Sequence, residues 1–589
     1  MADPLTGVAA AAAETSPPPA QPSTEPPEPN PSKATIQRTF LRYTLSPSEY
    51  ATIYNTLAAR SRRRDGRGAA LAKAVTRRIP SVEGFERSFG AARPVKRKEG
   101  ADEGAAASGD GGANGDGDET AAAVRASLRI FAGTWAALGV WEGVKKKVFQ
   151  RGKTIAQPPR STLLSPNIRL SLSLSTIFLL HRLLYRFLSV FRGTLLSSEA
   201  RPFRIRNPRI SRVLVSRLAP AVGASLAGSL LAVYPADQLR MTMAIYAITK
   251  AVEFAWNRAD RAGLVGWRPW WFGSWMLFPV SCGQLLHAFI FDRDCFPTNF
   301  GDFILKYSGN YIQKRPEDYP ASLPWPDTHE IVDNLATVAK MNYPPFISPI
   351  LFPNSNKGLP SAITAIAPVV DPAHPAIKHL TCAMLHPADP SCVRAYLTFY
   401  IQAFPRLARF VTILFAVLSL PRYRSFLAKP LPSIEALSKS IVRTSLFFAG
   451  AIGTSWGSIC LLQHLLPRTF LPTQRFFLGG AMGGLWAFLE RKGGRGKFTY
   501  GARLSVDSAW KVATKHGWVK GVKYGDVWVF VAGLALLNAV YEVDPAAVDS
   551  GPLRKVLGFA RGKGYVDVVA KEKEKDLENE EETEDAKTR

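Results

Sequence analysis

Cysteine is scarce in this chain of 589 residues, which has five cysteines at irregular spacing. An odd, irregular set does not form the disulfide framework of a small secreted protein. The sequence also lacks a nucleic-acid-binding motif, an H-E-x-x-H pair and a Gly-rich phosphate loop in a βαβ setting. We therefore expect no nucleic acid as a partner, no cofactor and no enzymatic activity.

Acidic residues are also few, 47 against 74 Lys and Arg, so the net charge is +27, although 47% of the chain is apolar. Clustered apolar spans with basic loops combine both properties and suit an anionic membrane face. The first 32 residues have no basic start before an apolar core, and the last three are Lys-Thr-Arg. We expect no signal peptide, no mitochondrial presequence and no Ser-Lys-Leu signal, so that any organelle address is internal.

The chain contains an internal repeat. Residues 246–265 read YAITKAVEFAWNRADRAGLV, and residues 500–519 read YGARLSVDSAWKVATKHGWV. The two segments align without a gap, and Tyr, Val, Ala, Trp, Ala, Gly and Val coincide. Each follows a small-residue apolar segment and precedes a long apolar one. Duplicated units of this kind are typical of membrane proteins.

The apolar segments predict an all-α, polytopic integral membrane protein of two related helical units with disordered termini. A span needs about 20 apolar residues, and several segments are shorter, so we expect six to eight membrane helices. The segments are 128–141, 170–191, 218–234, 271–291, 399–420, 445–466, 476–489 and 527–541. The predicted regions are 1–120 (disordered and basic), 121–300 (membrane unit 1), 301–393 (connecting loop), 394–545 (membrane unit 2) and 546–589 (charged C-terminal tail).

Small residues recur at helical spacing within the apolar segments. The stripes are Ala224, Gly228 and Ala232; Ala449, Gly453 and Gly457; Gly479 with Gly483; and Gly480 with Gly484. Because lipid tails are as apolar as Leu, helices in a membrane associate largely through close backbone packing, which small residues allow. We expect close packing within the chain or a seam between two copies of it.

The two repeats carry acids at equivalent positions, Glu253 and Asp507. An acid at membrane depth is costly and usually functional, which would favour a role in transport or proton transfer. Lys250 lies three residues before Glu253, and Arg503 lies four before Asp507. Helical spacing therefore predicts ordinary ion pairs for both acids, and we prefer this interpretation.

Histidine and cysteine gather in one segment, which contains His374, His379, Cys382, His386 and Cys392. Zinc needs four nitrogen or sulfur ligands, with Cys382, His386 and Cys392 among the candidates here. The spacing fits no standard zinc finger, and three prolines restrict the backbone. The preferred interpretation is an ordinary loop, with a zinc site and a Cys382–Cys392 disulfide as the alternatives.

Residues 486–521 resemble the N-terminal half of the transmembrane protein 135 family. The shared pattern is an apolar span that ends in Glu-Arg-Lys, a basic Arg-Gly turn and a Tyr-led amphipathic helix. The matching residues here are Glu490, Arg491, Lys492, Arg495, Gly496 and Tyr500. The segment from Cys382 to Cys392 is similar to that family's entry segment, and the likeness covers about residues 210–310 and 380–545.

The resemblance implies a protein of the peroxisomal membrane, or alternatively of a mitochondrial membrane, with distant similarity to the Tim translocase superfamily. The implied function is non-enzymatic support of lipid or metabolite passage, or of organelle organisation. The alternatives are a subunit of a channel or protein-import complex and an intramembrane lipid-modifying enzyme. The implied partners are the lipid bilayer, a second copy of the chain and peroxisomal membrane-protein targeting factors.

Overall fold

A computed structural model describes residues 40–61, 73, 75–76, 79–87, 113–149, 165–317, 319–320, 322–353, 359–572 and 574. Within these residues every regular element is a helix, and the one β interaction is an isolated bridge between Pro345 and His379. The predicted all-α class is confirmed. The chain divides into two compact units, residues 1–130 and 131–589.

The first unit is organised around Tyr50 in α2 (Pro47–Ser61). Its ring stacks on Phe85 of α4 (Val82–Arg87), with the ring centroids 3.9 Å apart, and its hydroxyl donates to the Pro80 carbonyl at 2.5 Å. Helix α5 (Ala113–Phe149) begins in this unit and continues past its boundary. Residues 47–61, 82–87 and 113–120 are therefore helical, which corrects the expectation that residues 1–120 are disordered throughout.

Five helices of the second unit have the length and composition to cross a membrane. They are α6 (Pro166–Leu196), η3 with α11 (Ser274–Phe291), α16 (Cys392–Ser419), α18 (Pro430–Leu465) and α21 (Gly525–Val543). A pair bent by 81°, Pro208–Val215 with Ala219–Val233, makes a sixth if it crosses as one span. Among the described residues, the expected six to eight spans are therefore reached, at six, only if this pair crosses as one span.

Both copies of the repeat fold into helices. Helix α10 (Gln238–Arg261) follows α9 (Ala219–Ala224) and η2 (Ser225–Val233), and α20 (Arg495–Lys515) follows α19 (Gln474–Gly484) and η7 (Leu485–Glu490). Just beyond each repeat helix lies an equivalent glycine, Gly263 or Gly517, with φ of +70° or +72°. Only glycine adopts this left-handed conformation without a steric cost, so these two positions end both helices in the same way.

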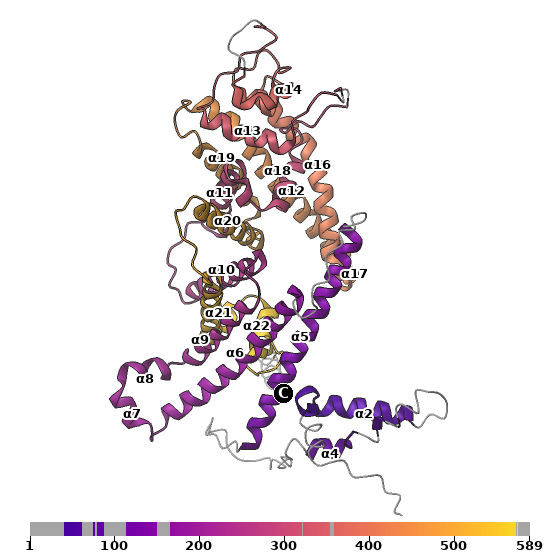
Figure 1. The fold of residues 1–589 in the computed structure, drawn as a ribbon, viewed down its shortest axis with the longest axis vertical. Coiled ribbons are helices and arrows are strands. Elements are labelled where there is room, and N and C mark those ends of the chain that lie inside the picture. Colours follow the sequence, from indigo (N-terminus) through magenta and orange to yellow (C-terminus); the bar gives the residue numbers. More distant parts are fainter. Residues whose placement is uncertain are drawn as a thin grey trace, which may run out of the picture. The chain divides into compact units, whose positions relative to one another are not determined.

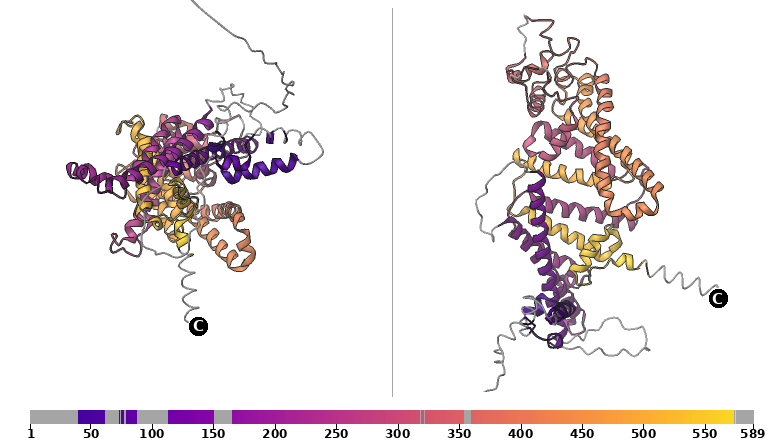
Figure 2. Two further views of the ribbon diagram at one scale, coloured as in Figure 1. Left: turned by 90° about the horizontal axis from the view of Figure 1, so that it is seen from below. Right: turned by 90° about the vertical axis from the view of Figure 1, so that its right-hand side faces the viewer.

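Helices from the two halves of the sequence alternate in space. Helix α10 packs against α21, α11 packs against α19 and α20, and α10 also contacts α20. Figure 1 labels these helices, and the right-hand view of Figure 2 shows magenta and gold helices in alternation. The helices of the predicted units 121–300 and 394–545 that lie in the second compact unit therefore share one interleaved packing.

The expected connecting loop, residues 301–393, is largely folded. It holds the end of α12 (Thr298–Tyr307), α13 (Thr328–Lys340), η5 (Ser361–Ile366), α14 (Ala367–Val370) and α15 (Leu380–Leu385). A capping box starts α13, in which Asp327 and Glu330 satisfy each other's backbone N–H groups. Buried side chains of this segment join α11, α16 and α18 in one hydrophobic core. The prediction of a loop was wrong, because the capping box starts a helix and the apolar side chains of this segment are buried despite its prolines.

The expected C-terminal tail also folds in part. Helix α22 (Gly551–Ala560) follows η8 (Pro545–Ala547), and Leu557 packs with α10 and α21 side chains. Arg561 donates to Glu542 at 2.6 Å, and Arg554 pairs with Asp567 at 2.7 Å. The first pair ties the end of α22 to α21, and the second joins α22 to the residues that follow it.

The remaining helices of the second unit are short connections. They are α7 (Arg201–Arg206), α8 (Pro208–Val215), η3 (Ser274–Met276), η4 (Arg293–Cys295), η6 (Leu420–Arg422) and α17 (Tyr423–Ala428). Much of the expected disordered region, including residues 1–39, 62–72 and 88–112, lies outside the described residues, as does the charged tail from residue 575 onward.

Candidate metal centre and apolar cavity

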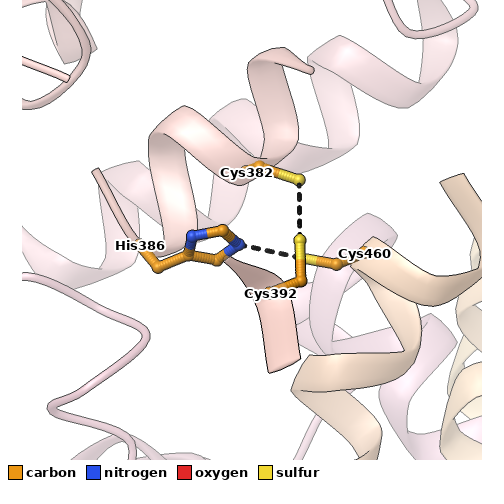
Figure 3. A group of neighbouring side chains, drawn as sticks. All are labelled: Cys382, His386, Cys392 and Cys460. Atoms are coloured by element: carbon orange, nitrogen blue, oxygen red, sulfur yellow. Dashed lines mark hydrogen bonds between the residues drawn. The ribbon is translucent and has the colours of Figure 1, made fainter. Parts of the chain in front are cut away.

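Three cysteines and one histidine from separate elements converge in the second unit. Cys382 lies in α15, His386 directly follows α15, Cys392 begins α16, and Cys460 lies near the end of α18. Figure 3 shows the four side chains pointing toward one another. Their ligand atoms all lie within 4.8 Å of one another. Such a donor set of three Cys and one His is one that zinc accepts.

The distances within the cluster are those of non-bonded neighbours. The Cys382 and Cys392 sulfurs are 3.7 Å apart, and the Cys460 sulfur is 3.4 Å from His386 Nε2. A disulfide needs about 2.05 Å between sulfurs, and all five cysteines are free in this structure. Cys382, His386 and Cys460 are buried, and Cys392 is half-buried.

The orientation of His386 is set by its other ring nitrogen. Its Nδ1 lies 2.7 Å from the Asp389 carbonyl oxygen, to which Nδ1–H donates. This bond leaves Nε2 free to face the sulfurs, which is the usual outer-shell arrangement of a metal-binding histidine. Burial lowers the pKa of His386, but hydrogen bonds with the Cys382 and Cys392 sulfurs raise it, to about 10.

The structure brings together the three weak sequence candidates, Cys382, His386 and Cys392, and adds Cys460, which the sequence analysis missed. The other two histidines of the segment stay outside the cluster: His374 accepts from the Ala376 N–H, and the His379 ring packs on that of His464. A signal for Cys460 was present in the sequence. Cys460 and His464 repeat the C-x3-H spacing of Cys382 and His386, which places both side chains on one helical face.

A separate apolar cavity of about 470 Å³ lies among α11, α12, α18 and α20. Nine of its twenty lining residues are aromatic, including Phe278, Phe303 and Trp456. Ser455, Lys497 and Tyr500 are also among its lining residues. Its volume and apolar lining are those of pockets that take small apolar ligands.

One serine in the cavity wall belongs to a G-x-S-x-G match, residues 453–457. In hydrolases this motif needs a strand-to-helix turn that exposes the serine beside a histidine base. Here Ser455 lies inside α18, and no His, Asp or Glu occurs among the described residues that line the cavity. The match therefore does not make a nucleophile elbow.

The acid of the first repeat forms ion pairs. Glu253 accepts from Lys250 at 2.8 Å, as the helical spacing predicted, and from Arg495 at 2.9 Å. Arg495 begins α20, so the acid of one repeat helix contacts the first turn of the other.

The acid of the second repeat has a matching arrangement. Asp507 accepts from Lys511 at 2.9 Å and from Gln238, in the first turn of α10, at 2.9 Å. The prediction that Arg503 pairs with Asp507 was wrong, because the Arg503 guanidinium lies over the Tyr246 and Tyr500 rings. Each acid therefore links its own repeat helix to the first turn of the other repeat helix.

Residues of the Glu-Arg-Lys turn serve packing and charge pairing. Glu490 is buried, accepts from Thr444 at 2.8 Å and lies 3.3 Å from the Lys497 ammonium. The Arg491 guanidinium lies over the Phe488 ring at 4.1 Å.

The rest of this pattern is more exposed. Lys492 and Gly496 are exposed, and Gly496 and Tyr500 line the cavity. Tyr500 is the sixth residue of α20, which begins at Arg495, so the helix starts before the tyrosine that the resemblance placed at its head.

The glycine stripes meet neighbouring helices of the same chain. A Cβ at Gly479 would meet Ser458, and one at Gly483 would lie 2.6 Å from the Ala451 carbonyl oxygen, both in α18. A Cβ at Gly228 would lie 3.0–3.2 Å from side chains of α21. These stripes allow α19 and η2 to approach their partners closely, so they need no second copy of the chain.

Gly453 and Gly457 receive aromatic rings of α16. An added Cβ would lie 2.7 Å from Phe399 and 2.8 Å from Tyr396, respectively. We expect Gly453→Leu with Gly457→Leu to lower the thermal unfolding temperature in detergent, because both rings must move. An unchanged unfolding temperature and unchanged abundance would contradict this packing.

No protein-family model, curated protein or solved structure gives a match to this chain.

Proposed function

We propose that this protein is a multi-span helical membrane protein of two related units that binds a lipid acyl chain and supports lipid passage without catalysis. The apolar cavity carries the proposal, since two of its walls, α11 and α18, are also candidate membrane spans. A lipid chain reaches such a cavity from the bilayer without crossing water. The resemblance to transmembrane protein 135 adds a peroxisomal location, or a mitochondrial one, to the proposal.

The proposal of two related units is supported by the matching order of elements around α10 and α20. It is also supported by the reciprocal contacts of Glu253 with Arg495 and of Asp507 with Gln238. In many transporters, two repeats enclose the substrate site between them. The cavity fits this plan because α11 comes from one half of the sequence and α18 and α20 come from the other.

Membrane integration is tested first. We expect the full-length protein to stay in the membrane pellet after alkaline carbonate extraction, because five helices are long and apolar enough to span. Imaging a tagged chain against peroxisomal and mitochondrial markers tests the location. Release of the protein into the supernatant would contradict the proposal as a whole.

Lipid binding is tested by filling the cavity. Leu504 of α20 lines it, whereas Val506 of the same helix is 50% exposed. We expect Leu504→Trp to reduce co-purified lipid at least about fivefold, because the larger ring occupies the acyl-chain volume. Lipid would be measured by mass spectrometry of protein purified in a lipid-free detergent.

Val506→Trp is the matched control and should retain the wild-type amount of lipid. The thermal unfolding temperature of Leu504→Trp identifies a variant that has merely lost its fold. A folded Leu504→Trp protein with the full amount of lipid would contradict the acyl-chain proposal. Ion or peptide conductance in reconstituted vesicles would instead favour the channel or import alternative, and turnover of a lipid would favour the enzyme alternative.

A further inference from the structure

We infer that Cys382, His386, Cys392 and Cys460 bind one zinc ion in a closed, structural site. This inference is independent of the proposed lipid-binding function. It rests on the convergence of four donor atoms from α15, the turn after it, α16 and α18.

The separations between donor atoms fit a tetrahedral ion. With Zn–S of about 2.3 Å and Zn–N of about 2.0–2.1 Å, two sulfur ligands lie roughly 3.8 Å apart and a sulfur and a nitrogen roughly 3.6 Å apart. The observed values are 3.7 Å for Cys382 and Cys392 and 3.4 Å for Cys460 and His386. The remaining pairs lie within 4.8 Å. A cluster with two irons divides its ligands between two metals and spreads them farther, so a single ion fits best.

The surroundings of the four residues favour a structural site over a catalytic one. Cys382, His386 and Cys460 are at most 3% exposed, and all four positions of a tetrahedron are filled by the protein. A catalytic zinc site instead keeps one position open for water or substrate. The Asp389 carbonyl, which accepts from His386 Nδ1–H, supplies the outer-shell contact expected of a zinc-bound histidine.

Ordinary packing is the simplest competing explanation, because free cysteine is among the most buried residue types. Cys295 is such a case, being buried and outside the cluster. Packing alone does not explain why three of the chain's five cysteines lie beside one histidine, whose Nε2 faces the Cys460 sulfur. The site would fasten residues 380–392 to the end of α18 and fix the starting point of α16.

The test is metal analysis of the full-length protein purified in detergent without added chelator. We expect about one zinc per chain, a loss of at least about tenfold in Cys460→Ser and in His386→Ala, and retention in the matched control Cys295→Ser. His386→Cys should keep the zinc, because four soft ligands remain. Absence of metal, or iron or copper in place of zinc, would overturn the inference.

A second measurement on the unmodified protein covers the case in which the variants fail to fold. Cys392 is half-buried and therefore reports on the site through its reaction with a small maleimide. If zinc is bound, Cys392 reacts only after a zinc chelator is added. Reaction without any addition would show bare thiols, and reaction only after a reductant would show a disulfide; either result contradicts the inference.

Discussion

Gly480→Ala combined with Gly484→Ala should destabilise the protein strongly, although each change adds a single methyl group. An added Cβ at Gly480 would lie 2.9 Å from the Cys282 carbonyl carbon, and one at Gly484 would lie 2.8 Å from the Pro279 nitrogen. Both neighbours are backbone atoms of α11, which cannot rotate away as a side chain does. We expect a loss of at least about 2 kcal/mol in the free energy of unfolding, because overpacking separates α11 from α19.

Gly193→Ala in α6 is the control for this pair, since a Cβ there meets nothing within 4 Å. Alanine is favoured over glycine inside a helix by roughly 0.5–1 kcal/mol. The control should therefore be neutral or slightly stabilising, the opposite direction from the α19 double variant. Thermal and denaturant unfolding in one detergent would measure both. Equal effects in the two proteins would contradict the close approach of α19 to α11.

Asp526→Ala should be the most damaging single charge removal. Arg240 of α10 pairs with Asp526 in the first turn of α21, through Nε to one carboxylate oxygen and through Nη2 to the other at 3.0 Å. Their side chains are 5% and 11% exposed. Removing Asp526 leaves a buried guanidinium charge without its counter-ion, which costs about 3–5 kcal/mol.

Two comparisons make this prediction specific. Arg240→Met with Asp526→Leu removes both charges and should recover most of the lost stability, because no unpaired charge stays buried. Glu435→Ala breaks a pair with Lys439 in which both side chains are more than 60% exposed, so it should cost at most about 1 kcal/mol. If Asp526→Ala lowered the unfolding free energy no more than Glu435→Ala does, the Arg240–Asp526 pair would not be structural.

Periodicity made much of the local structure predictable. The repeat at residues 246–265 and 500–519 became α10 and α20, and six of the eight apolar segments became candidate spans or the bent pair. Segment 128–141 lies inside α5, and segment 476–489 became α19 and η7, neither of which passes the test for a span. The i,i+3 pair of Lys250 and Glu253 was also predictable, because it depends on helical geometry alone.

Long-range partners were not predictable from spacing. Asp507 has Lys511 one turn after it and Arg503 one turn before it, and only the packing of Arg503 on the Tyr246 ring decides between them. The pairing of Arg495 with Glu253 joins residues 242 positions apart. Likewise, which residues of segment 301–393 are buried follows only from its packing against α11, α16 and α18.

The candidate metal centre was likewise predictable only in part from the sequence. The sequence determined that Cys382, His386 and Cys392 lie within eleven residues, together with the helical class and the apolar spans around them. Tertiary structure alone decided that His374 and His379 stay outside and that Cys460, 68 residues after Cys392, completes the set. The physical reason is that ligand convergence depends on where α16 and α18 meet. Burial of apolar faces across distant helices determines that meeting point, and local periodicity carries no information about it.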